Sequence, residues 1–203
     1  ITRQISGIAG GHLDDETMNK LIDARLREEL KSGVQTIQYQ INTLMTTNGQ
    51  SPFVTLFLNL DKDDEYLEEN AMIVEEILRQ RLEGIKNEKG VYVTPAFPKL
   101  IYVLDEHNCL KGGKYDYITK LAVECSSKRL YPDYISAKQM RATYQGNVFS
   151  CMGCRSFLSP WKDENGNFKF EGRFNQGVVS INLPQIGILA NKDEDAFWKL
   201  FDE

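Results

Sequence analysis

The chain has 203 residues, of which 41% are hydrophobic and 26% charged, an ordinary composition for one soluble domain with one sizeable core. A net charge of -5, with no cluster of Lys and Arg, argues against a protein that binds nucleic acid or an anionic membrane. Four cysteines, no secretory signal and no apolar run long enough to cross a membrane predict a cytoplasmic protein with reduced thiols.

Helical and strand patterns alternate along the first half of the chain, which predicts an α/β fold. Nearly continuous apolar runs mark two buried strands with an amphipathic helix between them, so the strands should pair in parallel through a right-handed crossover. The first helix should end near Gly33. The expected elements are, in order, helices over 13–30 and 34–45, a strand over 53–60, a helix over 65–82 and a strand over 98–104.

The second half continues with a helix over 115–130 and a helical pattern over 135–144. After a cysteine-containing loop we expect a turn over 163–166 and a strand over 177–183. The chain starts at Ile1 and ends directly after an apolar-periodic stretch, which is typical of a segment excised from a longer protein.

The two cysteines Cys151 and Cys154, separated by Met152 and Gly153, allow several interpretations. They can form a dithiol redox pair, supply half of a metal site, or combine one working thiol with an inert neighbour. The commonest alternative is that both cysteines are buried and serve only as small apolar packing residues. No second short-spaced pair of ligands accompanies these cysteines, which argues against a zinc site. The residues after them have a strand and turn pattern, whereas a thioredoxin-like motif would open a helix, so the dithiol interpretation is second in rank.

Residues 152–158 (MGCRSFL) and 172–184 (GRFNQGVVSINLP) together resemble the active-site core of anaerobic, class III, ribonucleoside-triphosphate reductases. Residues 36–55 and 124–133 are similar to two further blocks that this family carries in the same order. The resemblance covers nearly the whole chain, and four ordered blocks are more specific than one short cysteine motif.

The resemblance implies that residues 1–203 are a single segment of the catalytic domain and form about half of the ten-stranded α/β barrel of ribonucleotide reductases and glycyl-radical enzymes. A regulatory lobe and the thiyl cysteine would precede the segment, and a glycyl-radical loop with a zinc site would follow it. The segment alone should be inactive. Its unpaired strand edges predict low solubility or oligomerisation.

In relatives, a glycyl radical takes a hydrogen from a cysteine, whose thiyl radical then takes the ribose 3′-hydrogen and labilises the 2′-hydroxyl. The resemblance implies that Cys154 is the other active-site cysteine, on the ribose face from which the 2′-hydroxyl leaves. Met152 matches a methionine that is associated with the subgroup that uses formate as reductant. Gly153, the next residue, would also lie on the substrate side. Asn175 matches an active-site amide, which can donate to and accept from formate or sugar hydroxyls.

Each of these residues has an ordinary alternative. Cys154 could be a buried packing residue, although the neighbouring Arg155 can stabilise a thiolate and favours function. Met152 could fill a gap in a core, and Asn175 could cap a turn. Cys151 is expected to be a packing residue.

The other candidate residues receive structural interpretations. His12 and His107 stand among polar residues and are expected at the surface, so no metal site is predicted. Cys109 and Cys125 are expected to be structural. Residues 48–51 form a loop that could offer backbone N–H groups to phosphates, but an ordinary turn is preferred.

The function that the resemblance implies is formate-dependent anaerobic reduction of ribonucleoside triphosphates for DNA replication, with ATP binding and allosteric control. Glycyl radical, zinc and formate would belong to the complete enzyme, a homodimer activated by a radical-SAM enzyme. The alternative is a stand-alone, non-catalytic α/β thiol-redox or interaction module, which would require a reversible disulfide between Cys151 and Cys154.

Overall fold

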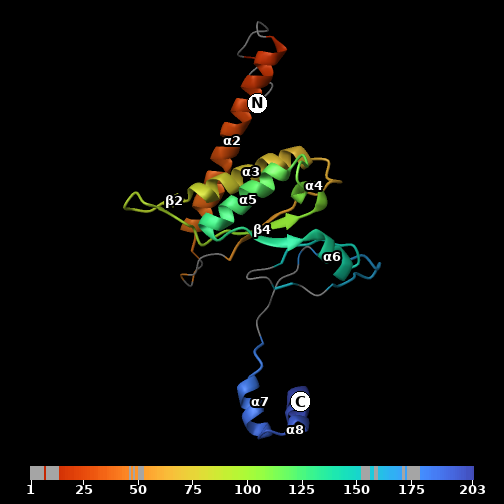
Figure 1. Cartoon of the computed structure of the whole chain (residues 1–203). Coiled ribbons are helices and arrows are strands. Elements are labelled where there is room, and N and C mark those ends of the chain that lie inside the picture. The colour runs from red at the N-terminus through yellow and green to blue at the C-terminus, as the bar shows by residue number, and fades with distance from the viewer. Residues whose placement is uncertain are drawn as a thin grey trace. The chain divides into compact units, whose positions relative to one another are not determined.

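The computed structural model describes residues 7, 14–45, 47, 49, 53–151, 156–157, 160–170, 172 and 179–203. The chain divides into two compact units, 1–160 and 161–203, and each is described here by itself. Helices and parallel strands alternate in the first unit (Figure 1), so the predicted α/β class is confirmed. Within the described residues, no helix is both long enough and apolar enough to cross a membrane.

A three-stranded parallel sheet forms the centre of the first unit, in the order β1 (Thr55–Leu58), β4 (Lys99–Leu104), β5 (Asp133–Ser136). The register places Tyr102 of β4 opposite Leu58 on one side and opposite Tyr134 on the other. The parallel pairing predicted for the first two strands is therefore confirmed. A short antiparallel hairpin of β2 (Ile85–Lys86) and β3 (Tyr92–Val93) lies outside this sheet.

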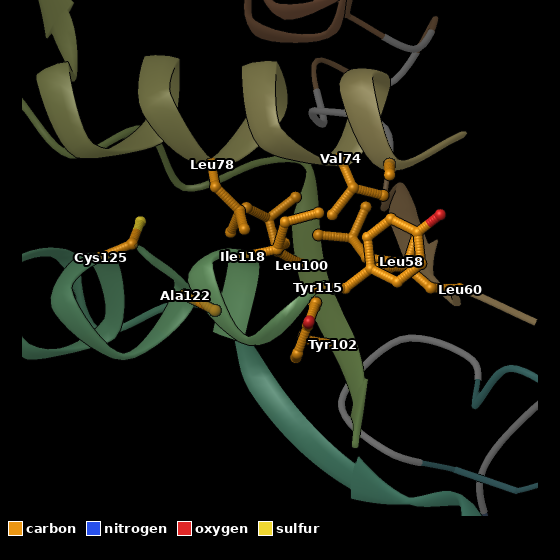
Figure 2. Close-up of a cluster of buried hydrophobic side chains, with 11 residues drawn as sticks. Leu58, Leu60, Val74, Leu78, Leu100, Tyr102, Tyr115, Ile118, Ala122 and Cys125 are labelled. Carbon is orange, nitrogen blue, oxygen red and sulfur yellow. The ribbon is translucent and has the colours of Figure 1, made fainter. Parts of the chain in front are cut away.

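The main core lies between the sheet and two helices, α3 (Leu67–Glu83) and α5 (Asp116–Arg129). Figure 2 shows Val74 and Leu78 of α3 and Ile118 of α5 converging on Leu100 of β4. Burial of a Leu, Val or Ile side chain contributes about 1.5–3 kcal/mol, so these contacts hold the two helices to the sheet. Ile101 and Val103, which alternate to the opposite face of β4, are equally buried.

The expected break near Gly33 is wrong, because α2 (Asp15–Thr43) is one continuous helix through this position. A glycine inside a helix costs only about 1 kcal/mol relative to alanine. Burial of the adjacent Val34, at 8% exposure, compensates for this cost. The helix begins at Asp14, whose side chain accepts a hydrogen bond from Thr17 N at 2.8 Å.

Three short elements near β4 and β5 differ from the sequence pattern. The strand β5 was not predicted, and its parallel hydrogen bonds with β4 explain why this short segment is extended. A helical turn, α4 (Glu106–Cys109), forms between the predicted strand over 98–104 and the predicted helix over 115–130, where no element was predicted. The helix α6 (Ala137–Thr143) is shorter than the predicted 135–144 and begins after Ser136, whose hydroxyl accepts from Gln139 N.

In the second unit, the predicted turn at 163–166 is confirmed, with Gly166 N donating to Asp163 O at 2.9 Å. The predicted strand over 177–183 is wrong for its described part, since residues 179–182 are not extended in a sheet and Leu183 begins helix α7 (Leu183–Ala190). Asn182 caps this helix through Gln185 N, and proline in the first turn needs no N–H partner. A final helix, α8 (Glu194–Asp202), confirms the terminal helical pattern.

Candidate functional site

Polar residues gather where the three parallel strands end at their carboxyl termini. They line a hollow of about 660 Å³ that collects residues following β1, β4 and β5. In open α/β sheets ligands bind outside this edge, so the hollow is the candidate site of the first unit. Its lining residues are Asp61, Lys62, Asp63, Asp105, Glu106, His107, Lys138, Arg141 and Gly146.

Asp105 and Arg141 form a two-pronged ion pair at this edge. Arg141 Nη1 donates to Asp105 Oδ1 at 3.1 Å, and Nη2 donates to Oδ2 at 2.6 Å. The Asp105 side chain is only 11% exposed. The hydrogen bond from Arg141 lowers the pKa of Asp105 below its ordinary value. Asp105 is thus held as a carboxylate. Its role is to hold α6 to the end of β4, and it is not suited to act as a general base.

The turn after Asp105 is fixed from both sides by Asn108, which is fully buried. Asn108 Nδ2 donates to Val103 O at 2.9 Å, and its Oδ1 accepts from Asp105 N at 3.0 Å. Thr119 Oγ1 donates to the Asn108 carbonyl at 2.7 Å, which ties the turn to α5. A buried amide with satisfied hydrogen bonds makes this edge of the sheet rigid.

His107 is half-buried and not at the surface as predicted. Its ring packs edge-to-face against Tyr115 with 6.2 Å between the centroids. Its Nε2 atom is buried and has no hydrogen-bond partner among the described residues. The imidazole therefore contributes ring packing to the wall of the hollow. His12, the other histidine, lies outside the described residues.

Charges around the hollow nearly balance. Three cationic side chains, Lys62, Lys138 and Arg141, face four carboxylates among the lining residues. Within the described part of the chain, no group of three or more His, Cys, Asp or Glu residues could hold a metal ion. The hollow offers both donors and acceptors, which suits hydrogen bonding to hydroxyl groups better than binding of a highly charged ion.

Three rings of the first unit lie on either side of the cysteine motif in the sequence. They are Tyr144, Phe149 and Phe157, which we call the aromatic cluster. The Tyr144 and Phe149 centroids are 4.9 Å apart, those of Phe149 and Phe157 are 6.1 Å apart, and Tyr144 stacks on Phe157 at 6.3 Å. Phe149 is 6% exposed, so the cluster is partly core.

The predicted site residues Cys154, Met152, Gly153 and Asn175 lie outside the described residues. The neighbouring Cys151 is described and is buried at 1% exposure, which confirms its interpretation as a packing residue.

The two cysteines at a distance from the motif differ in exposure. Cys125 is fully buried in the core of Figure 2, and desolvation raises the pKa of its thiol to about 11, which confirms a structural role. Cys109 ends α4 and is exposed. Of the loop 48–51, only Gly49 is described.

Asp105, Asn108 and Arg141 were not among the site residues predicted from the sequence. Aspartate directly after an apolar strand pattern, with asparagine three residues later, is a signal for a helix cap, and both side chains form a capping box here. The partner Arg141 has no comparable signal, because it is distant in sequence and meets Asp105 only through the parallel pairing of β4 with β5.

The parallel sheet with its polar carboxyl edge defines an α/β protein of the class that places its functional site at the strand ends. A family model described as anaerobic ribonucleoside-triphosphate reductase matches residues 4–203. The chain therefore belongs to the anaerobic ribonucleoside-triphosphate reductase family, and the resemblance inferred from the four sequence blocks is confirmed.

Individual relatives with the name anaerobic ribonucleoside-triphosphate reductase agree with this assignment. The Escherichia coli K12 protein is 43% identical over 183 residues, which are 89% of this chain and 24% of the relative. The Salmonella typhimurium protein is also 43% identical, over 182 residues and the same shares. The phage T4 protein is 39% identical over 204 residues, 95% of this chain and 33% of the relative. The chain spans about a quarter to a third of the length of these relatives.

Proposed function

We propose that the complete protein reduces ribonucleoside triphosphates to 2′-deoxyribonucleoside triphosphates and that Cys154 is a catalytic thiol of this reaction. The observation that carries the proposal is the family match over residues 4–203, which includes both the Cys154 and the Asn175 motifs. The relatives from E. coli, S. typhimurium and phage T4 are named for reductases of ribonucleoside triphosphates.

Formate is the proposed reductant. The balanced reaction consumes one ribonucleotide, one formate and one proton, and it yields one deoxyribonucleotide, one carbon dioxide and one water. The two electrons come from the formate C–H bond, and the 2′-hydroxyl leaves as water. The amide of Asn175 can bind formate or a sugar hydroxyl without changing its charge, and Met152 and Gly153 would line the same side of the substrate.

We further propose that the three strands of the first unit are part of a ten-stranded α/β barrel. In the part of the chain that the structure describes, β1 and β5 each pair with β4 alone and leave one edge without a strand. A barrel would pair both edges, which agrees with the general avoidance of open strand edges in native proteins.

The complete enzyme would also need components that the described residues do not supply. A glycyl radical would supply the radical chemistry, installed by a radical-SAM activating enzyme, and allosteric binding of ATP would control a homodimer. The described residues do not fit a zinc site, so we assign zinc to none of them. Reduced thiols suit the cytoplasm, where we place the enzyme.

Activity of the complete, anaerobically activated enzyme with carbon-14 formate tests the function and the reductant separately. We expect one labelled carbon dioxide for each deoxyribonucleotide. Deoxyribonucleotide formation driven by a dithiol, with no labelled carbon dioxide, would reject formate as the reductant but would leave the proposed function standing. No deoxyribonucleotide under any reductant would reject the function.

The alternative of a stand-alone thiol-redox module is not favoured by the structure. Such a module needs a Cys151 that can exchange with an external thiol or disulfide. Cys151 is buried at 1% exposure, and exchange of this kind depends on access to the sulfur.

A further inference from the structure

Three cationic side chains belong to the amino end of the parallel sheet, the edge opposite the hollow. Arg81 lies in the last turn of α3, Lys99 is the first residue of β4, and Arg129 is the last residue of α5. Within the described part of the chain, none of the three forms an ion pair with Asp or Glu. Because the chain as a whole carries a net charge of -5, these cations are a local exception.

The two arginines have structural roles. Arg129 donates to the last two carbonyls of α3, from Nε at 2.9 Å and from Nη2 at 2.7 Å, so its charge complements the carboxyl end of that helix. Arg81 is 3% exposed and donates to the carbonyls of Pro95 and Pro98. The cavity beside it, of about 30 Å³, has room for about one water molecule. Arg81 therefore acts as a buried positive charge and not as a contact for a larger ligand.

Lys99 is different, because it caps no helix and its ammonium keeps open donors. Its Nζ atom lies 4.7 Å from the ring centroid of Tyr131 and 5.8 Å from that of Phe97. It donates to Tyr131 Oη, and among the described residues it has no other hydrogen-bond acceptor. An ammonium has three N–H donors, so two remain, and the Tyr131 hydroxyl keeps its own O–H for donation. N–H and O–H donors are thus adjacent.

The charges around the Tyr131 ring favour an anion. The Arg81 guanidinium lies over this ring, 5.8 Å from its centroid, so two cations share one aromatic side chain. Cation–π contacts contribute about 0.5–2 kcal/mol each, which offsets only part of the cost of removing a charge from water. Burial lowers the pKa of Arg81, as expected for a guanidinium without a neighbouring carboxylate. An anion beside Lys99 would compensate both charges.

We propose that Lys99 and Tyr131 form a binding site for a small oxyanion at the amino edge of the sheet. Phosphate and small carboxylates such as formate fit this site, because both present charged oxygens to the N–H donors of Lys99 and the O–H donor of Tyr131. The ring of Phe97, which packs edge-to-face against Phe53 at 4.9 Å, forms an apolar wall on one side of Lys99. The inference does not depend on the proposed role of Cys154.

Protection of Lys99 from acetylation measures whether the site is occupied in the complete protein. The protein, without radical activation, is treated with N-hydroxysuccinimidyl acetate in chloride, phosphate or formate at one ionic strength. Mass spectrometry then gives the rate at each lysine. We expect phosphate, formate or both to slow the acetylation of Lys99 several-fold relative to chloride, and the more effective anion identifies the ligand. Equal rates in all three salts would overturn the proposal, whether or not the complete protein reduces nucleotides.

Lys86 is the matched control. Its Nζ atom lies 5.2 Å from the ring centroid of Tyr92, a cation–π contact like that of Lys99, but in the described structure it forms no hydrogen bond with the tyrosine hydroxyl. The acetylation rate of Lys86 should therefore be equal in the three salts. An equal slowing at Lys86 and Lys99 would mean a general salt effect and would overturn the proposal.

Tyr131→Phe tests the hydroxyl, since it keeps the ring that contacts Arg81 and Lys99. Loss of one hydrogen bond to a charged group should raise the anion concentration for half-maximal protection of Lys99 about 10-fold. An unchanged concentration would overturn the assignment of Tyr131 to the site. Lys99→Gln gives a second measurement that needs no acetylation. The anions should raise the Tm of this variant less than that of the wild type, and an equal rise would overturn the proposal.

Discussion

Arg141 and Asp105 are 36 residues apart in sequence and meet through two hydrogen bonds of 3.1 and 2.6 Å at the end of β4. The same carboxylate accepts from Glu106 N at 2.8 Å and so begins α4. One side chain therefore joins the central strand, the turn that follows it and α6. The geometry of the carboxyl edge of the sheet depends on this pair.

Asp105→Asn should remove the charge of this pair but keep the helix cap, since Asn is as good an N-cap as Asp. We expect a loss of about 1–2 kcal/mol in the free energy of unfolding, measured by urea denaturation. Asp105→Ala should cost about 1 kcal/mol more, because the cap is also lost. The control is Glu16→Gln in the exposed pair with Lys20, where the change should stay within about 0.5 kcal/mol. Equal stabilities for Asp105→Asn and wild type would contradict this account.

The ion pair also predicts a pH dependence. The hydrogen bond from Arg141 lowers the pKa of Asp105 from its ordinary 3.8, so the folded state binds this proton less readily than the unfolded state. The stabilisation is therefore complete above the unfolded pKa and is lost as the pH falls below it through the folded pKa. The stability difference between wild type and Asp105→Asn should be constant from pH 7 to 5 and should shrink at pH 3. A difference that grew towards acid pH would have the wrong sign.

Two glycines should respond to alanine in opposite directions. Gly84 has φ +88°, and a Cβ there would lie 2.7 Å from Val93 O, so Gly84→Ala should destabilise by more than about 1 kcal/mol. Gly33 is inside α2, and no described atom lies within 4 Å of the Cβ position. Gly33→Ala should stabilise by about 0.5–1 kcal/mol. Thermal unfolding of both variants measures this contrast, and a destabilised Gly33→Ala would argue for a helix break at that position.

The thiols of Cys109 and Cys125 should react at very different rates. Cys109 is exposed, whereas Cys125 is fully buried and desolvation raises the pKa of its thiol to about 11. Because the thiolate is the reactive form, iodoacetamide at pH 8 should label Cys109 in the folded protein and Cys125 only after unfolding. Mass spectrometry of peptides from native and urea-treated samples locates the label. Rapid labelling of native Cys125 would contradict the packing of α5 in Figure 2.

The strands and helices with long apolar patterns could be predicted from the sequence. Leu100 and Tyr102 on β4, and Val74 and Leu78 on α3, are buried together, and this burial is what their periodicity encodes. The strand β5 could not be predicted, because its extended backbone depends on hydrogen bonds to β4 more than on its own side chains.

Alternating apolar residues suggested a strand over 177–183, but capping by Asn182 and a proline in the first turn begin helix α7 instead. Local chemistry at a helix start thus outweighed a short period-two pattern.

Of the candidate site residues too, some could be predicted from the sequence and others could not. The motif around Cys154 could be identified because its residues are consecutive, and the family match confirms the family that the motif suggested. The pair of Asp105 with Arg141 and the aromatic cluster could not, because each joins residues from separate elements. Only the packing of α6 against the end of the sheet brings them together.

The most direct test of the proposed function compares Cys154→Ala with Cys151→Ala in the complete, anaerobically activated enzyme, with deoxyribonucleotide formation as the measured quantity. We predict that Cys154→Ala abolishes turnover, whereas Cys151→Ala retains it after a moderate loss of stability, because Cys151 is buried packing. Deoxyribonucleotide formation by the Cys154→Ala enzyme at the wild-type rate would contradict a catalytic role for this thiol.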